Sequence, residues 1–198
     1  MDYGLGNLAS VANALSKLGI PCEITSEVSA LKSAKALILP GVGAAGQGMK
    51  NLKERGMDRV LLEHVQKGTP ILGICLGMQL LQSFSEEGNV KCLGIVKGNV
   101  RKFNTSLKVP EIGWNQMEIQ NSKLKNIFKK IPNTSFFYFV NSYYCIPEEK
   151  ETIIGTTEYG VNFCSMFVKE NIYGVQFHPE KSGDVGLQLL KNFWEVVC

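Results

Sequence analysis

The spacing of apolar and polar positions in the first half of the chain predicts alternating helices and strands. Apolar residues recur at helical intervals over about 8–18 and 55–66, which indicates two amphipathic helices. Short apolar runs, typical of strands buried on both faces, occur at 37–39 and 71–74, and 22–25 is also expected to form a strand. Strands and helices that alternate in this way predict parallel βαβ units with right-handed crossovers.

The second half of the chain has a different pattern. Short strand-like runs follow one another from about 100 to 177, including 136–140, 153–157 and 163–168. An apolar face at helical spacing returns over 185–197. Together these patterns predict an α/β fold, with a doubly wound, mostly parallel sheet, helices on both faces and an antiparallel strand extension.

Length and composition fit a single domain that spans residues 1–198. The chain has 198 residues, 44% of them apolar and 20% charged, without repeats or a linker. No apolar stretch is long enough to cross a bilayer, and the start lacks the pattern of a signal peptide. We therefore expect a cytoplasmic protein with no membrane contact. The net charge of +3 is too small to indicate a nucleic-acid partner.

The cysteines do not form a metal-binding pattern. There are six, and no two make a C-x-x-C pair, which argues against a zinc site. Scattered cysteines in apolar surroundings are typical of free thiols in a reducing compartment. We therefore expect neither a metal nor a cofactor.

Cys75 differs from the other cysteines because it directly follows the apolar run 71–74 and stands between Gly73 and Gly77. Glycines on both sides let a strand turn sharply into a helix, here expected over about 78–83, with the sulfur exposed at the turn. The positive end of that helix would favour the thiolate. The sequence therefore predicts a nucleophile, with a structural cysteine between two glycines as the alternative.

Only two histidines are available as a base for such a nucleophile. His64 lies in the second predicted helix, where we expect it on the surface. His178 ends an apolar, aromatic run typical of a buried strand, and Pro179 stops that strand. Glu180 is then free to accept a hydrogen bond from the imidazole. With Cys75, this gives a candidate nucleophile, base and orienting carboxylate.

A glycine-rich loop supplies candidate backbone donors. It follows the apolar run 36–40 and spans 41–48, where small residues allow N–H groups to approach a ligand. One amide of this loop, at Val42 or Gly43, and the amide of Leu76 would form an oxyanion hole. A phosphate-binding turn is the weaker alternative, because the chain lacks G-x-x-x-x-G-K-[ST].

Three of these blocks together resemble the signature of the class I glutamine amidotransferases, which hydrolyse glutamine to glutamate and ammonia. The blocks are 40–43, 73–79 and 178–180. Three more are similar to the glutaminase subunits of imidazole glycerol phosphate synthase, and with them the resemblance covers essentially the whole chain. These further blocks are 2–7, 109–115 and 138–143.

The resemblance implies a role for each residue of the triad. Cys75 would attack the side-chain amide carbon of L-glutamine and form a glutamyl thioester. His178 would protonate the departing ammonia and then activate the hydrolytic water, while Glu180 would orient His178 and balance its charge. No cofactor is implied.

The resemblance also implies a substrate pocket and a partner. Gln79 and the Gly41–Gly43 loop would line the glutamine pocket, and Ser142 and Tyr143 would hold the amino acid end of the substrate. Ammonia would pass to a barrel-type cyclase or synthase subunit in a heterodimer that serves histidine biosynthesis. The residues expected at that contact are Asn7 and Lys181.

Two features depart from the family pattern. Relatives usually have an apolar strand before the 2–7 block, whereas here only Met1 precedes Asp2. Either the start of the sequence is set too late, or the chain tolerates a truncated first strand, which would expose apolar surface and weaken the fold. Asn141 stands where relatives commonly carry histidine. Because this position is outside the triad, we expect an effect on glutamine binding or coupling and not on the chemistry.

Three other functions remain open from the sequence. The same glutaminase chemistry would serve a paralogous synthase, such as one that amidates a sugar for surface polysaccharide. A cysteine peptidase or γ-glutamyl hydrolase would use a related sheet and nucleophile. A glutaminase-like regulatory subunit without turnover would fit the truncated strand but not the complete triad.

Overall fold

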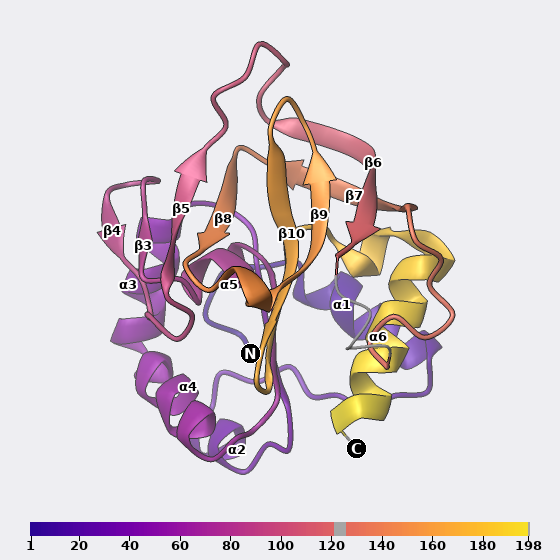
Figure 1. Cartoon of the computed structure of the whole chain (residues 1–198). Helices are drawn as coiled ribbons and strands as arrows, with labels where there is room; N and C mark the ends of the chain where they lie inside the picture. Colours follow the sequence, from indigo (N-terminus) through magenta and orange to yellow (C-terminus); the bar gives the residue numbers. More distant parts are fainter. Residues whose placement is uncertain (121–125, 198) are drawn as a thin grey trace.

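The computed structural model of the chain describes residues 1–120 and 126–197. It shows a curled, mixed β-sheet with helices packed against it (Figure 1). The predicted α/β fold, with helices on both faces of the sheet and an antiparallel extension, is confirmed.

The parallel part of the sheet consists of three strands. These are β1 (Leu37–Gly41), β2 (Ile71–Cys75) and β11 (Ile172–Val175). β2 lies between the other two, with Gly41 opposite Cys75 and Ile74 opposite Val175. Since the carboxyl ends of parallel strands meet at one edge of a sheet, the glycine loop after β1, Cys75 and His178 come together there.

The rest of the sheet is antiparallel, apart from the pairing of β3 with β5, so the parallel part is smaller than the sequence predicted. The strands are β3 (Phe84–Ser85), β4 (Val90–Lys91), β5 (Gly98–Lys102), β6 (Glu111–Ile119), β7 (Ser135–Asn141), β8 (Tyr143–Pro147), β9 (Ile153–Glu158) and β10 (Asn162–Lys169). From β5 to β11 the connections contain no α-helix in the described residues, and such connections favour antiparallel neighbours.

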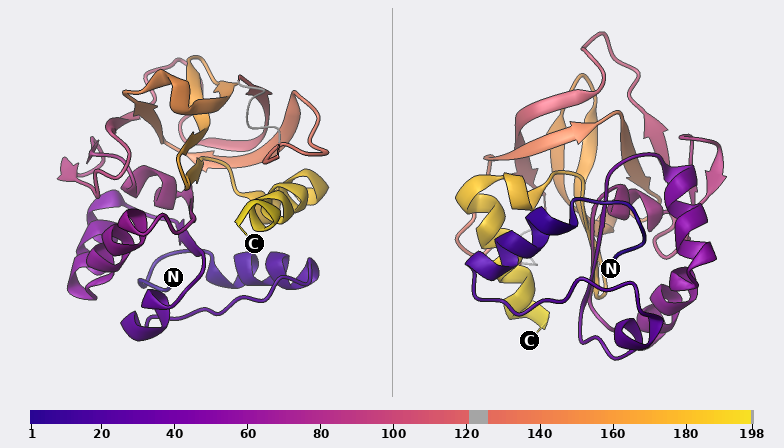
Figure 2. Two further views of the ribbon diagram at one scale, coloured as in Figure 1. Left: turned by 60° about the horizontal axis from the view of Figure 1, so that its bottom comes forward. Right: turned by 180° about the vertical axis from the view of Figure 1, so that it is seen from behind.

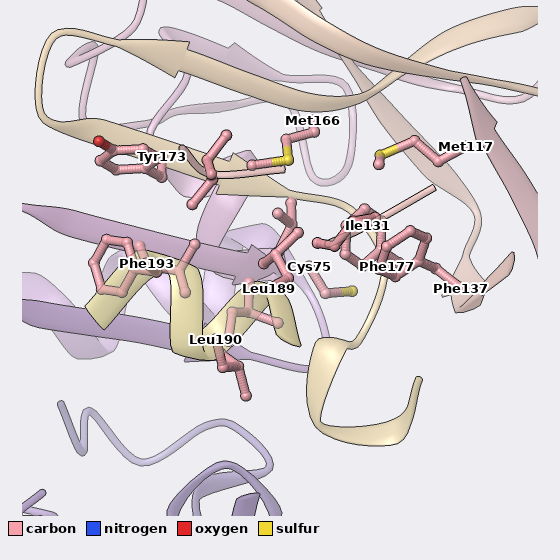
Figure 3. Packing of buried hydrophobic residues seen from close by; sticks show 14 of the residues in the cluster. Cys75, Met117, Ile131, Phe137, Met166, Tyr173, Phe177, Leu189, Leu190 and Phe193 are labelled. Atoms are coloured by element: carbon pink, nitrogen blue, oxygen red, sulfur yellow. The ribbon is translucent and has the colours of Figure 1, made fainter. Parts of the chain in front are cut away.

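Helices cover both faces of the parallel strands. One face carries α1 (Leu8–Lys17) and α6 (Gly183–Val197); the other carries α2 (Val28–Lys32), α3 (Ala45–Glu54), α4 (Met57–Gln66) and α5 (Leu76–Leu80). Leu72 and Ile74 face the first group and Ile71 the second. Figure 3 shows part of the first core, where Phe193 of α6 meets Tyr173 edge to face, at 5.2 Å between ring centroids. No helix among the described residues is long and apolar enough to cross a membrane.

The N-terminal end of the sheet differs from the predicted pattern. The run 22–25 is extended, but it is not a strand, because no neighbouring strand pairs with it among the described residues. Met1 and Asp2 also lie outside any strand. A strand needs a neighbour to complete its ladder of hydrogen bonds.

His64 is buried, so the prediction of a surface position on the second helix is wrong. Its side chain is 2% exposed on the inner face of α4. Nε2 donates to the carbonyl of Leu31, at 2.8 Å, and Nδ1 lies 2.9 Å from the hydroxyl of Thr69. The imidazole therefore ties α4 to α2 and to the loop that enters β2.

The substitution His64→Ala tests this structural role. It leaves the carbonyl of Leu31 without its donor and removes buried volume, so we expect the free energy of unfolding to fall by about 2 to 3 kcal/mol. Urea unfolding followed by circular dichroism measures this. Leu62→Ala, on the exposed face of the same helix, is the matched control and should change stability by no more than about 0.5 kcal/mol. Equal effects of the two substitutions would contradict the role given to His64.

Candidate active site

Cys75 occupies the sharp junction between β2 and α5. It is the last residue of the strand and the residue before the first turn of the helix. Its φ of 53° lies in the left-handed region that non-glycine residues rarely adopt. Strained backbone of this kind persists only where the surrounding structure holds it.

Gly73 and Gly77, on either side of Cys75, allow α5 to pack closely against the sheet, but they do not make the turn themselves. Cys75 has a positive φ, and neither glycine does. A methyl group on Gly77 would overlap the carbonyl of Leu39 in β1, and one on Gly73 would lie 2.8 Å from the amide nitrogen of Met78. The predicted turn is therefore present, but the glycines act by letting α5 lie directly against the sheet.

His178 and Glu180 form a buried pair just beyond β11. His178 is 3% exposed and precedes the short 3-10 helix η3 (Pro179–Lys181). Its Nδ1 lies 2.7 Å from Oε1 of Glu180, whose side chain is fully buried. The same oxygen accepts a hydrogen bond of 3.1 Å from the side-chain amide of Asn7. The carboxylate is thus held from two sides, with the imidazole as one partner.

The charges around His178 favour its protonated form. Burial by itself lowers the pKa of the imidazole, but the hydrogen bonds with Cys75 and Glu180, and the negative charges of these two groups, raise it to about 10. An imidazolium between a sulfur and a carboxylate is the arrangement that stabilises a reactive thiolate.

The sulfur of Cys75 has two further polar neighbours. The side-chain amide of Gln176 donates to Sγ at 3.6 Å, and the carbonyl oxygen of Val140 lies 3.8 Å from it. Gln79 donates in turn to Gln176, at 3.1 Å, and to the carbonyl of Tyr143, at 3.0 Å. Gln176 stands within the apolar run 172–177, and no sequence pattern predicts this contact.

A cavity of about 490 Å³ opens onto Cys75 and His178, a size typical of sites for small molecules. Its other lining residues are Val42, Gly43, Ala44, Leu76, Gln79, Glu87, Pro110, Val140, Asn141, Ser142, Tyr143 and Lys181. Most of the predicted site residues therefore meet here. Gly41 does not line the cavity, because it is buried against Tyr3 and Leu76. Asn7 and Glu180 lie behind His178 and also do not line it.

Two further polar groups line the cavity: Glu87, which the sequence did not mark, and Asn141, which was expected to affect glutamine binding. The carboxylate of Glu87 accepts a hydrogen bond of 2.7 Å from the amide of Ala45, which places it beside the glycine loop. Asn141 is buried; its Nδ2 donates to Tyr143, and its Oδ1 has no hydrogen-bond partner among the described residues. An unpaired buried acceptor is costly unless a ligand pairs with it.

Comparison with known proteins agrees with this geometry. The family model described as glutamine amidotransferase class-I matches residues 1–196. The chain belongs to the class I glutamine amidotransferase family. Two relatives of this amidotransferase are named imidazole glycerol phosphate synthase subunit HisH. One, from Moorella thermoacetica, is 47% identical over 198 residues, covering 100% of this chain and 93% of the relative. The other, from Chlorobium chlorochromatii, is 49% identical, covering 98% of each.

Solved structures with low sequence identity share the fold of this amidotransferase. A structure described as a glutamine amidotransferase matches with a TM-score of 0.74 at 20% identity, over 98% of this chain and 95% of the other. PurLQS from Thermotoga maritima matches with a TM-score of 0.73 at 16% identity, over 99% and 96%. At these identities the likeness shows the architecture alone.

The protonation of His178 can be tested directly, because the chain has only two histidines. In a histidine-selective NMR titration, with His64 assigned from its Asn variant, we expect the His178 ring to stay imidazolium up to about pH 10. Glu180→Gln should lower this midpoint by at least about one unit, because the negative partner is lost. A midpoint near 6.5 in the unaltered amidotransferase would contradict the ion pair.

The same pKa shift sets a pH dependence of stability. The folded-state pKa of about 10 lies above the ordinary value of 6.5. The ion pair therefore contributes its full share of the free energy of unfolding below about pH 6.5, and this share is lost as the pH rises through about 10.

Proposed function

We propose that this amidotransferase is the glutaminase subunit of an imidazole glycerol phosphate synthase. It hydrolyses L-glutamine to L-glutamate and ammonia and passes the ammonia to a barrel-type cyclase subunit in histidine biosynthesis. The observation that carries the proposal is the strained Cys75 beside the buried His178–Glu180 pair, at the floor of a cavity suited to an amino acid. The names of the relatives support the choice of synthase.

The chemistry follows from the triad. The Cys75 thiolate attacks the side-chain carbonyl carbon of glutamine and forms a tetrahedral oxyanion. His178 gives its proton to the departing ammonia, which leaves a glutamyl thioester on the sulfur. Neutral His178 then takes a proton from water, and the resulting hydroxide attacks the thioester to release glutamate and restore the thiolate. Glu180 holds the imidazole and stabilises its charged form in both halves of the reaction.

Backbone amides stabilise the oxyanion. Leu76 follows the nucleophile and lines the cavity, and Val42 and Gly43 line it from the loop after β1. The amide of Leu76 and one amide of this loop form the oxyanion hole in the proposed mechanism. Fixed donors of this kind are worth a few kcal/mol each, because they stabilise charge that develops only in the transition state.

The cavity also offers partners for the amino acid end of glutamine. Glu87 presents a carboxylate to the α-ammonium group, and the unpaired Oδ1 of Asn141 is a second acceptor. Ser142 and Tyr143 also line the cavity. Gln79 acts as a positioning residue, since its amide group is already bonded to Gln176 and to the Tyr143 carbonyl.

An exposed apolar patch beside the triad is the proposed contact with the cyclase. Ile112, Trp114 and Phe136, on the β6–β7 pair, are 61%, 54% and 51% exposed. Trp114 meets Tyr138 edge to face, at 6.0 Å between ring centroids, and the Lys181 ammonium lies 5.9 Å from the centre of the Tyr138 ring. Such exposed aromatic clusters mark protein interfaces. Since Lys181 is next to Glu180, a partner bound here would contact the triad through η3.

The alternatives have less support. A regulatory protein without turnover would not need the strained nucleophile or the charged pair. A paralogous synthase would use the same cavity, but both relatives compared above carry the name of imidazole glycerol phosphate synthase.

Cys75→Ala tests the division of labour between the subunits. In the complex with the cyclase, glutamine-dependent synthesis should fall by about four orders of magnitude or more, because the nucleophile is gone. Synthesis from added ammonium chloride should stay unchanged, because only the ammonia source is lost. Both rates are measured on the same purified complex, whose assembly is checked by gel filtration. Equal loss of both activities would refute the assignment.

Trp114→Ala tests the partner surface. Removing a large exposed aromatic from the centre of a contact should weaken cyclase binding by roughly ten- to a hundred-fold. Isothermal titration calorimetry measures the dissociation constant. Leu62→Ala removes an apolar side chain that is 42% exposed on α4, away from β6 and β7, and should leave binding unchanged. If the unaltered chain, Trp114→Ala and Leu62→Ala bind the cyclase with the same affinity, the contact lies elsewhere.

A further inference from the structure

The side chain of Gln176 is polar, fully buried and in contact with the nucleophile. Its exposed fraction is 0%, and it does not line the cavity. Gln176 directly follows β11, and in both views of Figure 2 the parallel strands lie between the two groups of helices. A buried amide costs stability unless its polar atoms are hydrogen-bonded. The triad by itself gives no reason for such a group at this position.

The chain after β11 brings two donors to one sulfur. Gln176 donates to Sγ of Cys75 from its side-chain amide, at 3.6 Å, and the ring of His178 is also hydrogen-bonded to this sulfur. Phe177, between them, turns into the apolar core, where it stacks on Phe137 at 4.0 Å between ring centroids (Figure 3). Side chains that alternate in this way are typical of extended backbone.

The neighbours of the sulfur favour different forms of Cys75. The carbonyl of Val140, 3.8 Å from Sγ, can only accept a hydrogen bond, so it favours the thiol. The amide of Gln176 donates, and a donor favours the thiolate. His178 favours the thiolate as well, but in the proposed mechanism it gives its proton to ammonia. Gln176 keeps its protons, so its bond to the sulfur is available in both halves of the reaction.

A backbone carbonyl fixes the direction in which the Gln176 amide points. The carbonyl of Tyr143 accepts hydrogen bonds from Nε2 of Gln79, at 3.0 Å, and from Nδ2 of Asn141, at 3.1 Å. Because a carbonyl can only accept, Gln79 must turn its NH₂ group toward it. The second hydrogen of that NH₂ group meets Oε1 of Gln176, at 3.1 Å. Gln176 then has only its own NH₂ group to present to the sulfur.

We propose that Gln176 is a catalytic residue that stabilises the Cys75 thiolate from the interior of the protein. Gln79 is the positioning residue that keeps the Gln176 amide turned toward the sulfur. This role rests on the proposed function of Cys75 as the nucleophile. Because Gln176 does not line the cavity, it leaves the cavity side of the sulfur free for glutamine.

The pH profile of Cys75 alkylation by iodoacetamide tests the proposal, because the thiolate is the form that reacts. Peptide mass spectrometry separates Cys75 from Cys22, which is exposed and serves as an internal reference. Gln176→Met keeps the length of the side chain and removes the donor. We expect the midpoint of the Cys75 profile to rise by about one pH unit, which is a ten-fold loss of thiolate on the acid side. The Cys22 profile should not change.

The substitution Gln79→Met tests the positioning step. The Gln176 amide is then free to turn, so the midpoint should move in the same direction, but by less. The double variant should move it no further than Gln176→Met alone, because both residues act on the sulfur through one hydrogen bond. If circular dichroism shows that Gln176→Met does not fold, Gln79→Met against the unaltered chain tests the same bond.

Gln82→Met is the matched control. Gln82 is also a fully buried glutamine, but it does not line the cavity and has no bond to Cys75 among the described residues. Its replacement should leave the alkylation profile of Cys75 unchanged.

Turnover in the complex with the cyclase gives a second measurement. Gln176→Met should lower kcat for glutamate formation by about ten-fold and change KM by less than about two-fold, because Gln176 is outside the cavity. Gln79→Met should also raise KM, since Gln79 lines the cavity.

Three results would overturn the proposal. In the first, Gln176→Met has the alkylation profile of the unaltered chain. In the second, Gln82→Met moves the midpoint as far as Gln176→Met, so the shift reflects general loosening. In the third, the shifts of the two single variants add in the double variant. Alkylation needs neither glutamine nor a partner, so a protein without turnover but with the expected shift would contradict the proposed function and not this role of Gln176.

Discussion

The rest of the site depends on one constrained backbone position, Cys75. A residue held at a φ of 53° at the end of β2 directs its sulfur out of the sheet and starts α5 at the next residue. This strain is held by close packing, since Gly77 lets α5 contact the carbonyl of Leu39. The same packing places Leu76 at the cavity wall, next to the loop that follows β1. Backbone geometry at one residue thus positions both the proposed nucleophile and a donor of the proposed oxyanion hole.

The second constraint is electrostatic. The side chain of Glu180 is fully buried, and both of its hydrogen-bond partners meet at one oxygen. The high pKa of His178 follows from this buried carboxylate and from the sulfur on the other side of the ring. Asn7, one of these partners, directly precedes α1. A residue near the start of the chain therefore helps to hold the carboxylate beside His178.

Much of the fold and of the candidate site could be predicted from the sequence, because these features depend on the local pattern of residues. Cys75 ends one short apolar strand and His178 follows another, and the structure brings these two residues and Glu180 together. The features that could not be predicted depend on contacts with residues far away in the sequence. His64 looked like a surface residue because its acceptor, Leu31, lies in another helix. The run 22–25 is not a strand because no strand among the described residues pairs with it. Glu87 and Gln176 reach the site only through the fold, and nothing near them in the sequence marks them.

The central claim is that this triad releases ammonia for a partner subunit. The most direct measurement is glutamate formation from L-glutamine by the purified chain, alone and with an equimolar amount of the barrel cyclase from the same genome. We expect turnover that rises when the cyclase is added, because the proposed contact includes Lys181, next to Glu180. A folded complex, shown by gel filtration, that releases no glutamate would contradict the account.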